Sequence, residues 1–213
     1  MTARDDVLAR IAAAQRTASP PDLPYGGIER DYRRSSDRNH DQLVARLVDR
    51  LIDYKAFVRR CPPTDLPAEV TRAVEARRLR SVAVPADLDP EWLTGLDDVT
   101  VRPDDADDRL TAAELDKIDG VITSCAVAVA ETGTLILDGS AGTGSRLVTL
   151  IPDYHLCIVL PDRIVADVPQ AIARLDPTRP LTMISGPSAT SDIELNRVEG
   201  VHGPRTLEVI IVE

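Results

Sequence analysis

Apolar residues recur along this chain at two different spacings, and the change between them divides it into two parts. Residues 4–16 and 43–58 have apolar side chains at helical spacing, so each stretch predicts a helix with one apolar face. From residue 19 to residue 41, prolines, glycines and charged residues predict an exposed link. We therefore expect residues 1–60 to form a helical arm and residues 61–213 to form an α/β domain. The second stripe comprises Leu43, Val44, Leu47, Val48, Leu51, Ile52, Phe57 and Val58.

Short aliphatic runs alternate with helical stretches through the rest of the chain. The runs predict strands, and their alternation with helices indicates an α/β fold with an open, mostly parallel sheet. Thr111 and Glu114 predict a capping box at the start of one helix, and residues 125–133 predict an apolar turn. The expected strands are residues 81–85, 99–102, 120–124, 134–138, 156–160, 181–185 and 206–213; the other expected helices are residues 65–79, a short one around Trp92, and residues 167–175.

Composition and charge narrow the classes of function. The net charge is −10 and the pI is about 4.8, which argues against a broad surface for nucleic acid or anionic membranes. Cys61, Cys125 and Cys157 are widely spaced without a CxxC pattern, so we expect buried residues and no disulfide framework, zinc site or iron–sulfur site. Residues 1–15 are charged and have no long apolar core, so we expect no signal peptide, and no apolar run approaches the ~18 residues of a membrane span. We therefore expect a cytoplasmic protein.

Two segments that follow apolar stretches carry the first candidate residues, because ligands of open α/β sheets bind beyond the carboxyl ends of strands. In 131-ETGT-134, Glu131 is costly to bury without a partner. Either its carboxylate accepts hydrogen bonds from the backbone N–H groups of the following turn, or it acts as a base, a nucleophile or an acceptor for a ligand hydroxyl. The glycine loop 139-GSAGTGSR-146 lacks the Walker A pattern and forms either a plain turn or an anion site with Arg146.

A third segment, 185-SGPSATSDIE-194, places hydroxyls beside carboxylates, and His202 follows it in a Gly-Pro turn. This histidine is either a structural hydrogen bonder or part of a site. The segment does not match a nucleophile elbow or a Ser–His–Asp triad, and the spacing of the three histidines gives no metal pattern. We expect the third segment to form one wall of a pocket at the strand ends, facing Glu131 and the glycine loop.

Three ordered motifs, 131-ETGTLILDG-139, 184-ISGPSATSDIE-194 and 200-GVHGP-204, closely resemble the LUD-domain family, and within it the LutC or YkgG group. The resemblance implies a fold similar to the NagB/RpiA/CoA-transferase-like and 5-formyltetrahydrofolate cyclo-ligase-like folds. It also implies a part in the oxidation of L-lactate to pyruvate, alongside two iron–sulfur partner proteins. Many relatives have SGPSRT where this chain has Ala189, so we expect Arg146 or Arg197 to replace that basic residue.

Two hypotheses of function follow. Because the chain has neither a cysteine cluster nor a GxGxxG fingerprint, we expect an accessory or small-molecule-binding subunit without its own redox centre. The alternative is an enzyme of the CoA-transferase or cyclo-ligase type that uses Glu131 as base or nucleophile. No cofactor is indicated, and a small organic anion is the expected ligand. The expected catalytic residues are Glu131, Asp192 and His202; the expected ligand-binding residues are Thr132, Gly133, Thr134, Gly142, Gly144, Ser145, Arg146, Ser185, Gly186, Pro187, Ser188, Glu194, Gly200 and Gly203.

Overall fold

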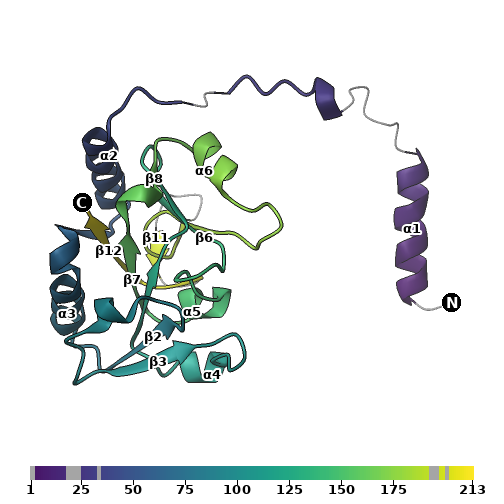
Figure 1. Cartoon of the computed structure of the whole chain (residues 1–213). Helices are drawn as coiled ribbons and strands as arrows, with labels where there is room; N and C mark the ends of the chain where they lie inside the picture. Colours follow the sequence, from purple (N-terminus) through teal and green to yellow (C-terminus); the bar gives the residue numbers. More distant parts are fainter. Residues whose placement is uncertain (1–2, 18–24, 33–34, 192–196, 200–201) are drawn as a thin grey trace. The chain divides into compact units, whose positions relative to one another are not determined.

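The computed structural model describes residues 3–17, 25–32, 35–191, 197–199 and 202–213 (Figure 1). The chain forms two compact units, Met1–Arg33 and Arg34–Glu213. The first contains α1 (Ala3–Thr17), as its helical spacing predicts, and the single turn η1 (Tyr25–Gly27). The acidic residues in the first turn of α1 and the basic residue in its last turn interact favourably with the helix dipole and so stabilise the helix.

The second unit begins with α2 (His40–Asp53), which belongs to the core of the α/β domain. Asn39 and Gln42 form a capping box at its start, where each side chain accepts a hydrogen bond from the other residue's backbone N–H. Val44, Leu47 and Leu51 are fully buried on one face, as the apolar stripe predicts. The boundary between the two units therefore lies before α2, earlier than the expected boundary at residue 60.

The predicted stripe extends too far, because α2 ends at Asp53 and Phe57 begins a strand. The helix ends in a Schellman motif, in which Ala56 N–H donates to the Leu51 carbonyl and Lys55 N–H donates to the Ile52 carbonyl. Lys55 has the left-handed φ of 69° that this motif requires. Glycine usually occupies that position, so the sequence carries no ordinary stop signal here.

Six parallel strands form the main sheet, in the order β1-β12-β7-β4-β2-β3. This arrangement confirms the open, mostly parallel sheet. Most of the strands are aliphatic and fully buried, as a parallel sheet covered on both faces requires. The strands are β1 (Phe57–Cys61), β12 (Thr206–Val212), β7 (Tyr154–Val159), β4 (Gly120–Ser124), β2 (Ser81–Pro85) and β3 (Thr100–Asp104).

A second sheet of four short strands has the order β8-β5-β6-β9. Its members are β8 (Ile164–Val165), β5 (Val127–Val129), β6 (Thr134–Leu137) and β9 (Thr182–Ile184). The expected apolar turn at residues 125–133 is wrong in its first half, because β5 pairs antiparallel with β6 there and every residue of β5 is buried. A separate hairpin joins β10 (Ala189–Ser191) to β11 (Arg197–Glu199).

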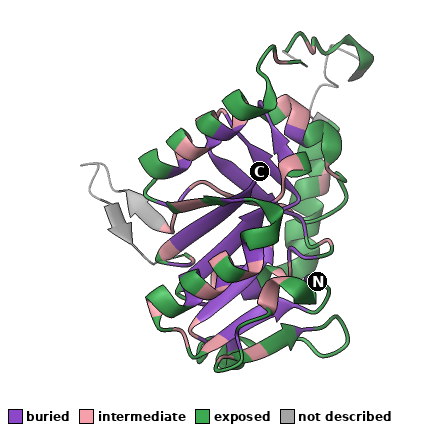
Figure 2. Ribbon diagram, turned by 60° about the vertical axis from the view of Figure 1, so that its left-hand side comes forward, coloured by how far each residue is buried: buried purple, intermediate pink, exposed green. Residues whose placement is uncertain are grey.

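Helices and the small sheet cover the main sheet on two faces (Figure 2). On one face lie α2 and the small sheet, which form the α2-side core; on the other lie α3 (Leu66–Arg77) and η3 (Pro90–Leu93), which form the α3-side core. All three cysteines are free, and all three are buried, as expected. The remaining elements are η2 (Pro63–Asp65), α4 (Ala112–Leu115) with its predicted capping box, α5 (Arg146–Leu150), η4 (Pro161–Arg163) and α6 (Val168–Arg174).

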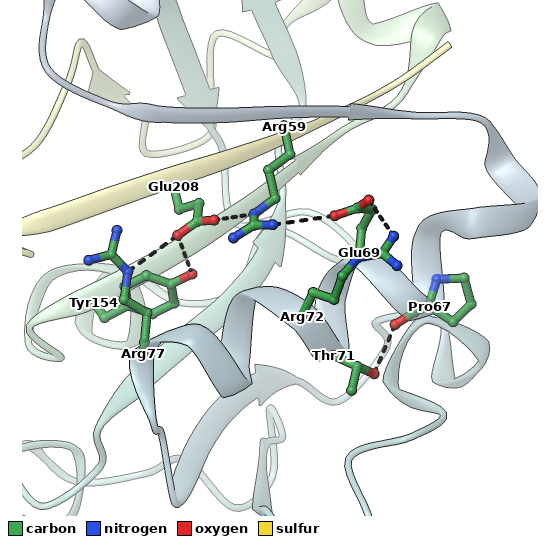
Figure 3. A network of polar contacts seen from close by, with 8 residues as sticks. All are labelled: Arg59, Pro67, Glu69, Thr71, Arg72, Arg77, Tyr154 and Glu208. Carbon is green, nitrogen blue, oxygen red and sulfur yellow. Dashed lines mark hydrogen bonds and ion pairs between the residues drawn. The ribbon is translucent and has the colours of Figure 1, made fainter.

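A buried carboxylate lies within the α3-side half of the protein (Figure 3). Glu208 of β12 is 2% exposed and accepts hydrogen bonds from Arg59, from Arg77 Nε at 3.4 Å and from the Tyr154 hydroxyl at 3.2 Å. The hydrogen bond to Glu208 raises the pKa of Arg59, and burial raises the pKa of Tyr154. The Arg77 guanidinium also lies 4.2 Å from the ring centroid of Phe57. This network joins β1, β12, β7 and α3.

Candidate functional site

Two glycines of the predicted site lie against the end of α2. Gly133 has a φ of 62°, and a Cβ placed on it would lie 2.7 Å from the Arg50 Cβ. Gly186 has a φ of 85°, and its Cβ would lie 2.5 Å from the Tyr54 carbonyl oxygen. Only glycine combines this left-handed backbone with such a close approach. The two glycines therefore position both motif segments against the same helix end.

A chain of three hydroxyls connects these two segments. The Thr132 and Thr134 hydroxyl oxygens are 2.7 Å apart, and the Thr134 hydroxyl is 2.8 Å from the Ser185 hydroxyl. The first and third predicted segments therefore meet, although more than 50 residues separate them in the sequence. Glu131 is half-buried, and its backbone N–H donates to the Ala166 carbonyl at 3.0 Å, next to the start of α6.

Ser185 lines a cavity of about 240 Å³, which we call the His155 cavity. The residues from the third segment and the Gly-Pro turn that line it are Ser185, Gly186, Pro187, Ser188, His202 and Gly203, all of them predicted site residues. Sequence reasoning did not select the others, which are Thr149, Leu150, His155, Thr182, Met183, Ile184, Pro204 and Leu207. Glu131 is not among the residues that line this cavity.

The cavity lies beside the amino ends of β7 and β12, because His155 and Leu207 are the second residues of those strands. The third segment follows the carboxyl end of β9, as expected, but the strands of the main sheet meet this cavity with their amino ends. The reason is the order of the chain: residues 202–204 come directly before β12 and so must lie at its amino end. Ser188 N–H donates to the Pro204 carbonyl at 2.8 Å, which brings residues 185–188 to the same place.

His155 is the most unusual residue of the cavity, because its imidazole is fully buried. Its Nε2 is 2.8 Å from the Thr123 hydroxyl oxygen, and Nδ1 has no hydrogen-bond partner among the described residues. Burial lowers the pKa of His155 from 6.5 to about 4, so the ring is neutral near pH 7. Buried polar atoms of native proteins almost always have partners. A fully buried ring nitrogen without one, in a residue that lines a cavity, therefore points to a ligand.

The mouth of the cavity is held together by backbone contacts. His202 N–H donates to the Ser188 hydroxyl oxygen at 3.1 Å, while the His202 side chain is exposed. Thr149, on α5, is buried and donates its hydroxyl proton to the Arg146 carbonyl at 3.2 Å. A histidine within the aliphatic run YHLCIV was the only sequence signal that could have identified the floor of this cavity.

The glycine loop lies elsewhere and lines a second cavity of about 270 Å³ together with Asp87, Asp104 and Asp105. Some of its amides have partners within the protein: Gly142 N–H donates to Asp87 Oδ1 at 2.8 Å, and Ser140 N–H donates to Asp138 Oδ1 at 3.0 Å. Arg109 also lines this cavity but is paired with Asp104, so acidic side chains predominate there. The expectation of a single pocket shared by the loop and the third segment is therefore corrected.

The other predicted residues of the glycine loop do not line the His155 cavity. Ser145 is the N-cap of α5, with its hydroxyl accepting from Val148 N–H. Gly142 is buried, Gly144 lines the acidic cavity and Arg146 is exposed. Their proposed role in ligand binding stays a prediction. Asp192, Glu194 and Gly200 lie outside the described residues, so their positions do not enter the site.

Within the described ranges, no group of three His, Cys, Asp or Glu side chains is arranged to hold a metal ion. No helix in the same part of the chain is both long and apolar enough to cross a membrane.

A family model described as the LUD domain matches residues 44–212, which include most of α2, the hydroxyl chain and the His155 cavity. The chain belongs to the LUD domain family. The match begins inside α2, which agrees with the place of this helix in the α2-side core. The narrower likeness of the LUD domain to the NagB/RpiA/CoA-transferase-like fold stays a prediction.

Several relatives of this LUD-domain protein carry the name lactate utilization protein C. The one from Deinococcus radiodurans is 46% identical over 177 residues, which make up 80% of each chain. The one from Shouchella clausii is 28% identical over 231 residues, covering 99% of this chain and 97% of the relative. A crystal structure of a DUF162 family protein from Deinococcus radiodurans has a TM-score of 0.68 and 38% identity, covering 83% of this chain and 99% of that chain.

The buried histidine predicts a loss of stability in mild acid. Between pH 6.5 and about 4 the unfolded chain binds a proton at His155 that the folded protein does not, so the free energy of unfolding falls as pH decreases. We expect this residue to contribute a loss of about 2 kcal/mol between pH 7 and pH 5. Urea unfolding of wild type and His155→Gln at both pH values checks it, because glutamine does not titrate. Equal pH dependence of the two proteins would contradict the prediction.

Proposed function

We propose that this protein acts in lactate utilization as a ligand-binding subunit, and that it holds a small carboxylic acid in the His155 cavity. The lactate utilization names of its relatives support the pathway. The observation that carries the binding role is His155, which lines the cavity, is fully buried and has no partner for Nδ1 among the described residues. A polar atom buried without a partner is costly, and a bound ligand offsets that cost.

The size and lining of the cavity support a small, oxygen-rich ligand. Its volume of about 240 Å³ is below the ~300–1,000 Å³ of pockets that take drug-sized molecules, which suits a metabolite of a few carbon atoms. The described lining contains hydroxyls and two imidazoles but no Asp, Glu, Lys or Arg side chain. Ser188 accepts from His202 N–H and keeps its own hydroxyl proton to donate to a ligand oxygen.

We further propose that iron–sulfur partner proteins carry the electrons of lactate oxidation. An iron–sulfur cluster needs several thiolates brought together. Here Cys61 is buried in the α3-side core, whereas Cys125 and Cys157 are buried in the α2-side core. Cys61 therefore lies apart from the other two thiols, and all three are buried, so they do not form an accessible set of ligands. Pull-down of the iron–sulfur proteins by the purified chain tests this part of the proposal, and no capture of either would contradict it.

Calorimetric titration with L-lactate and pyruvate tests the binding role. We expect wild type to bind at least one of them and Gly203→Ala to bind it more weakly. An added Cβ at Gly203 would lie 3.6 Å from the Leu150 and Ser188 side chains, so it narrows the cavity without a clash. Glu131→Gln serves as the control, because Glu131 lies outside the lining and its replacement should leave affinity within about twofold.

The opposite pattern would favour the alternative enzyme of the CoA-transferase or cyclo-ligase type. In that case Glu131→Gln would abolish binding or turnover with the fold intact, whereas Gly203→Ala would have no effect. Failure of both acids to bind wild type would show that the proposed ligand class is wrong.

A further inference from the structure

We propose that Thr123 holds His155 in the tautomer with its proton on Nδ1, so that the floor of the cavity donates a hydrogen bond to a carbonyl or carboxylate oxygen of the ligand. His155 is then a binding residue, and Thr123 is a positioning residue that acts through it. The identity of the ligand rests on the proposed function. The tautomer does not, because any oxygen in the cavity, including that of a water molecule, can accept from Nδ1–H.

The inference starts from the surroundings of Thr123. Its side chain is fully buried, and its hydroxyl is bonded to His155 Nε2 at 2.8 Å. No second partner for this hydroxyl exists in the described part of the chain, and Thr123 does not line the cavity. A threonine hydroxyl has one proton to donate, and a neutral imidazole has one N–H and one acceptor nitrogen. The pair can therefore be arranged in two ways.

The two arrangements differ in which donor is left over. If His155 Nε2 donates to Thr123, the hydroxyl proton of Thr123 has no acceptor, whatever the cavity holds. If Thr123 donates to Nε2, the leftover donor is the Nδ1–H of His155, in a residue that lines the cavity. A bound oxygen can then satisfy it. Buried donors without acceptors are rarer in native proteins than under-used acceptors, so the second arrangement is the stable one.

The rest of the cavity offers donors as well. The hydroxyls of Thr132, Thr134 and Ser185 carry three protons and form two hydrogen bonds with each other. One proton therefore remains, and it lies on Ser185, which lines the cavity, when Thr132 donates to Thr134 and Thr134 donates to Ser185. With the His155 N–H and the Ser188 hydroxyl, the cavity presents up to three donors. This set suits the two oxygens of a carboxylate and a neighbouring oxo group, that is, a small 2-oxo acid.

Nitrogen-15 NMR of the imidazoles tests the tautomer directly. The protein is labelled with nitrogen-15 at its three histidines, His40, His155 and His202. The signals that disappear in His155→Gln belong to His155. We expect wild type at pH 7 to show a protonated Nδ1 and an unprotonated Nε2. Thr123→Val, which removes the hydroxyl at nearly constant volume, should move the proton toward Nε2. Thr123→Ser should restore the wild-type pattern.

Affinity for pyruvate is the second readout. Loss of one donor–acceptor match of this kind is expected to weaken binding by roughly threefold to tenfold in Thr123→Val, with recovery in Thr123→Ser. A wild-type spectrum with the proton on Nε2 overturns the inference even if pyruvate binds, and the proposed function then still stands. A spectrum with the proton on Nδ1 but no binding of pyruvate or lactate upholds the tautomer and contradicts the proposed ligand instead. Because the first measurement uses wild type, it does not depend on the folding of any variant.

Discussion

Gly186→Ala is expected to lower the free energy of unfolding by about 3 kcal/mol, the sum of a left-handed backbone that alanine disfavours and a steric overlap. The φ of Gly186 is 85°, and its added Cβ would lie 2.5 Å from the carbonyl oxygen of Tyr54. That oxygen belongs to the backbone at the end of α2, so it cannot rotate away as a side chain does. Denaturant unfolding followed by circular dichroism measures the change.

Gly139→Ala is the matched control for this prediction. Gly139 has a similar φ of 69°, but no heavy atom lies within 4 Å of its added Cβ. Its replacement should therefore show only the conformational cost of about 1 kcal/mol. Equal losses in the two variants would mean that the close approach to α2 contributes nothing. A larger loss of stability in Gly186→Ala would show that the close approach to α2 requires a glycine at this position.

Glu208→Gln is expected to cost about 3 kcal/mol of stability, because it leaves two arginines without their shared countercharge. The Glu208 side chain is 2% exposed, and those of Arg59 and Arg77 are each 31% exposed, so solvent screens the arginines only in part. For a chain of this length the change corresponds to a decrease in Tm of roughly 6–12 °C. A thermal unfolding scan gives the result directly.

Glu213→Gln gives the comparison at a more exposed ion pair. Glu213 pairs with Arg60 at 2.6 Å, and the two side chains are 31% and 51% exposed. Surface ion pairs contribute little, so this variant should stay within about 1 kcal/mol of wild type. If it is as unstable as Glu208→Gln, burial of the carboxylate is not the cause of the effect.

Much of the fold could be predicted from local pattern. The aliphatic runs at Ser81–Pro85 and Gly120–Ser124 are strands, and the Thr111–Glu114 capping box starts a helix as expected. The pattern failed where tertiary contacts decide the structure. β1 reads FVRRC, with arginines that become acceptable only because Glu208 lies on the neighbouring strand β12 and Glu213 directly follows it.

The candidate site was predicted in part for a similar reason. Motif residues Ser185, Ser188 and His202 line one cavity, and the sequence had selected them as polar residues among turn formers. His155 was missed because its role depends on Thr123, a residue of another strand that pairs beside it. The acidic surroundings of the glycine loop were missed because Asp87 comes from the loop after β2. Contacts between distant segments are not visible in periodicity or composition.

β12 lies between β1 and β7, although it is the last described strand to be synthesised. Phe57 of β1 pairs with Glu208, so at the ribosome β1 waits on the order of ten seconds or more for its partner. During that time β1 has no neighbouring strand, and one edge of β7 is open to other chains. The nascent chain therefore exposes this strand edge until Val212 has emerged. Because β12 lies between β1 and β7, a truncation within β12 would separate β1 from the rest of the main sheet.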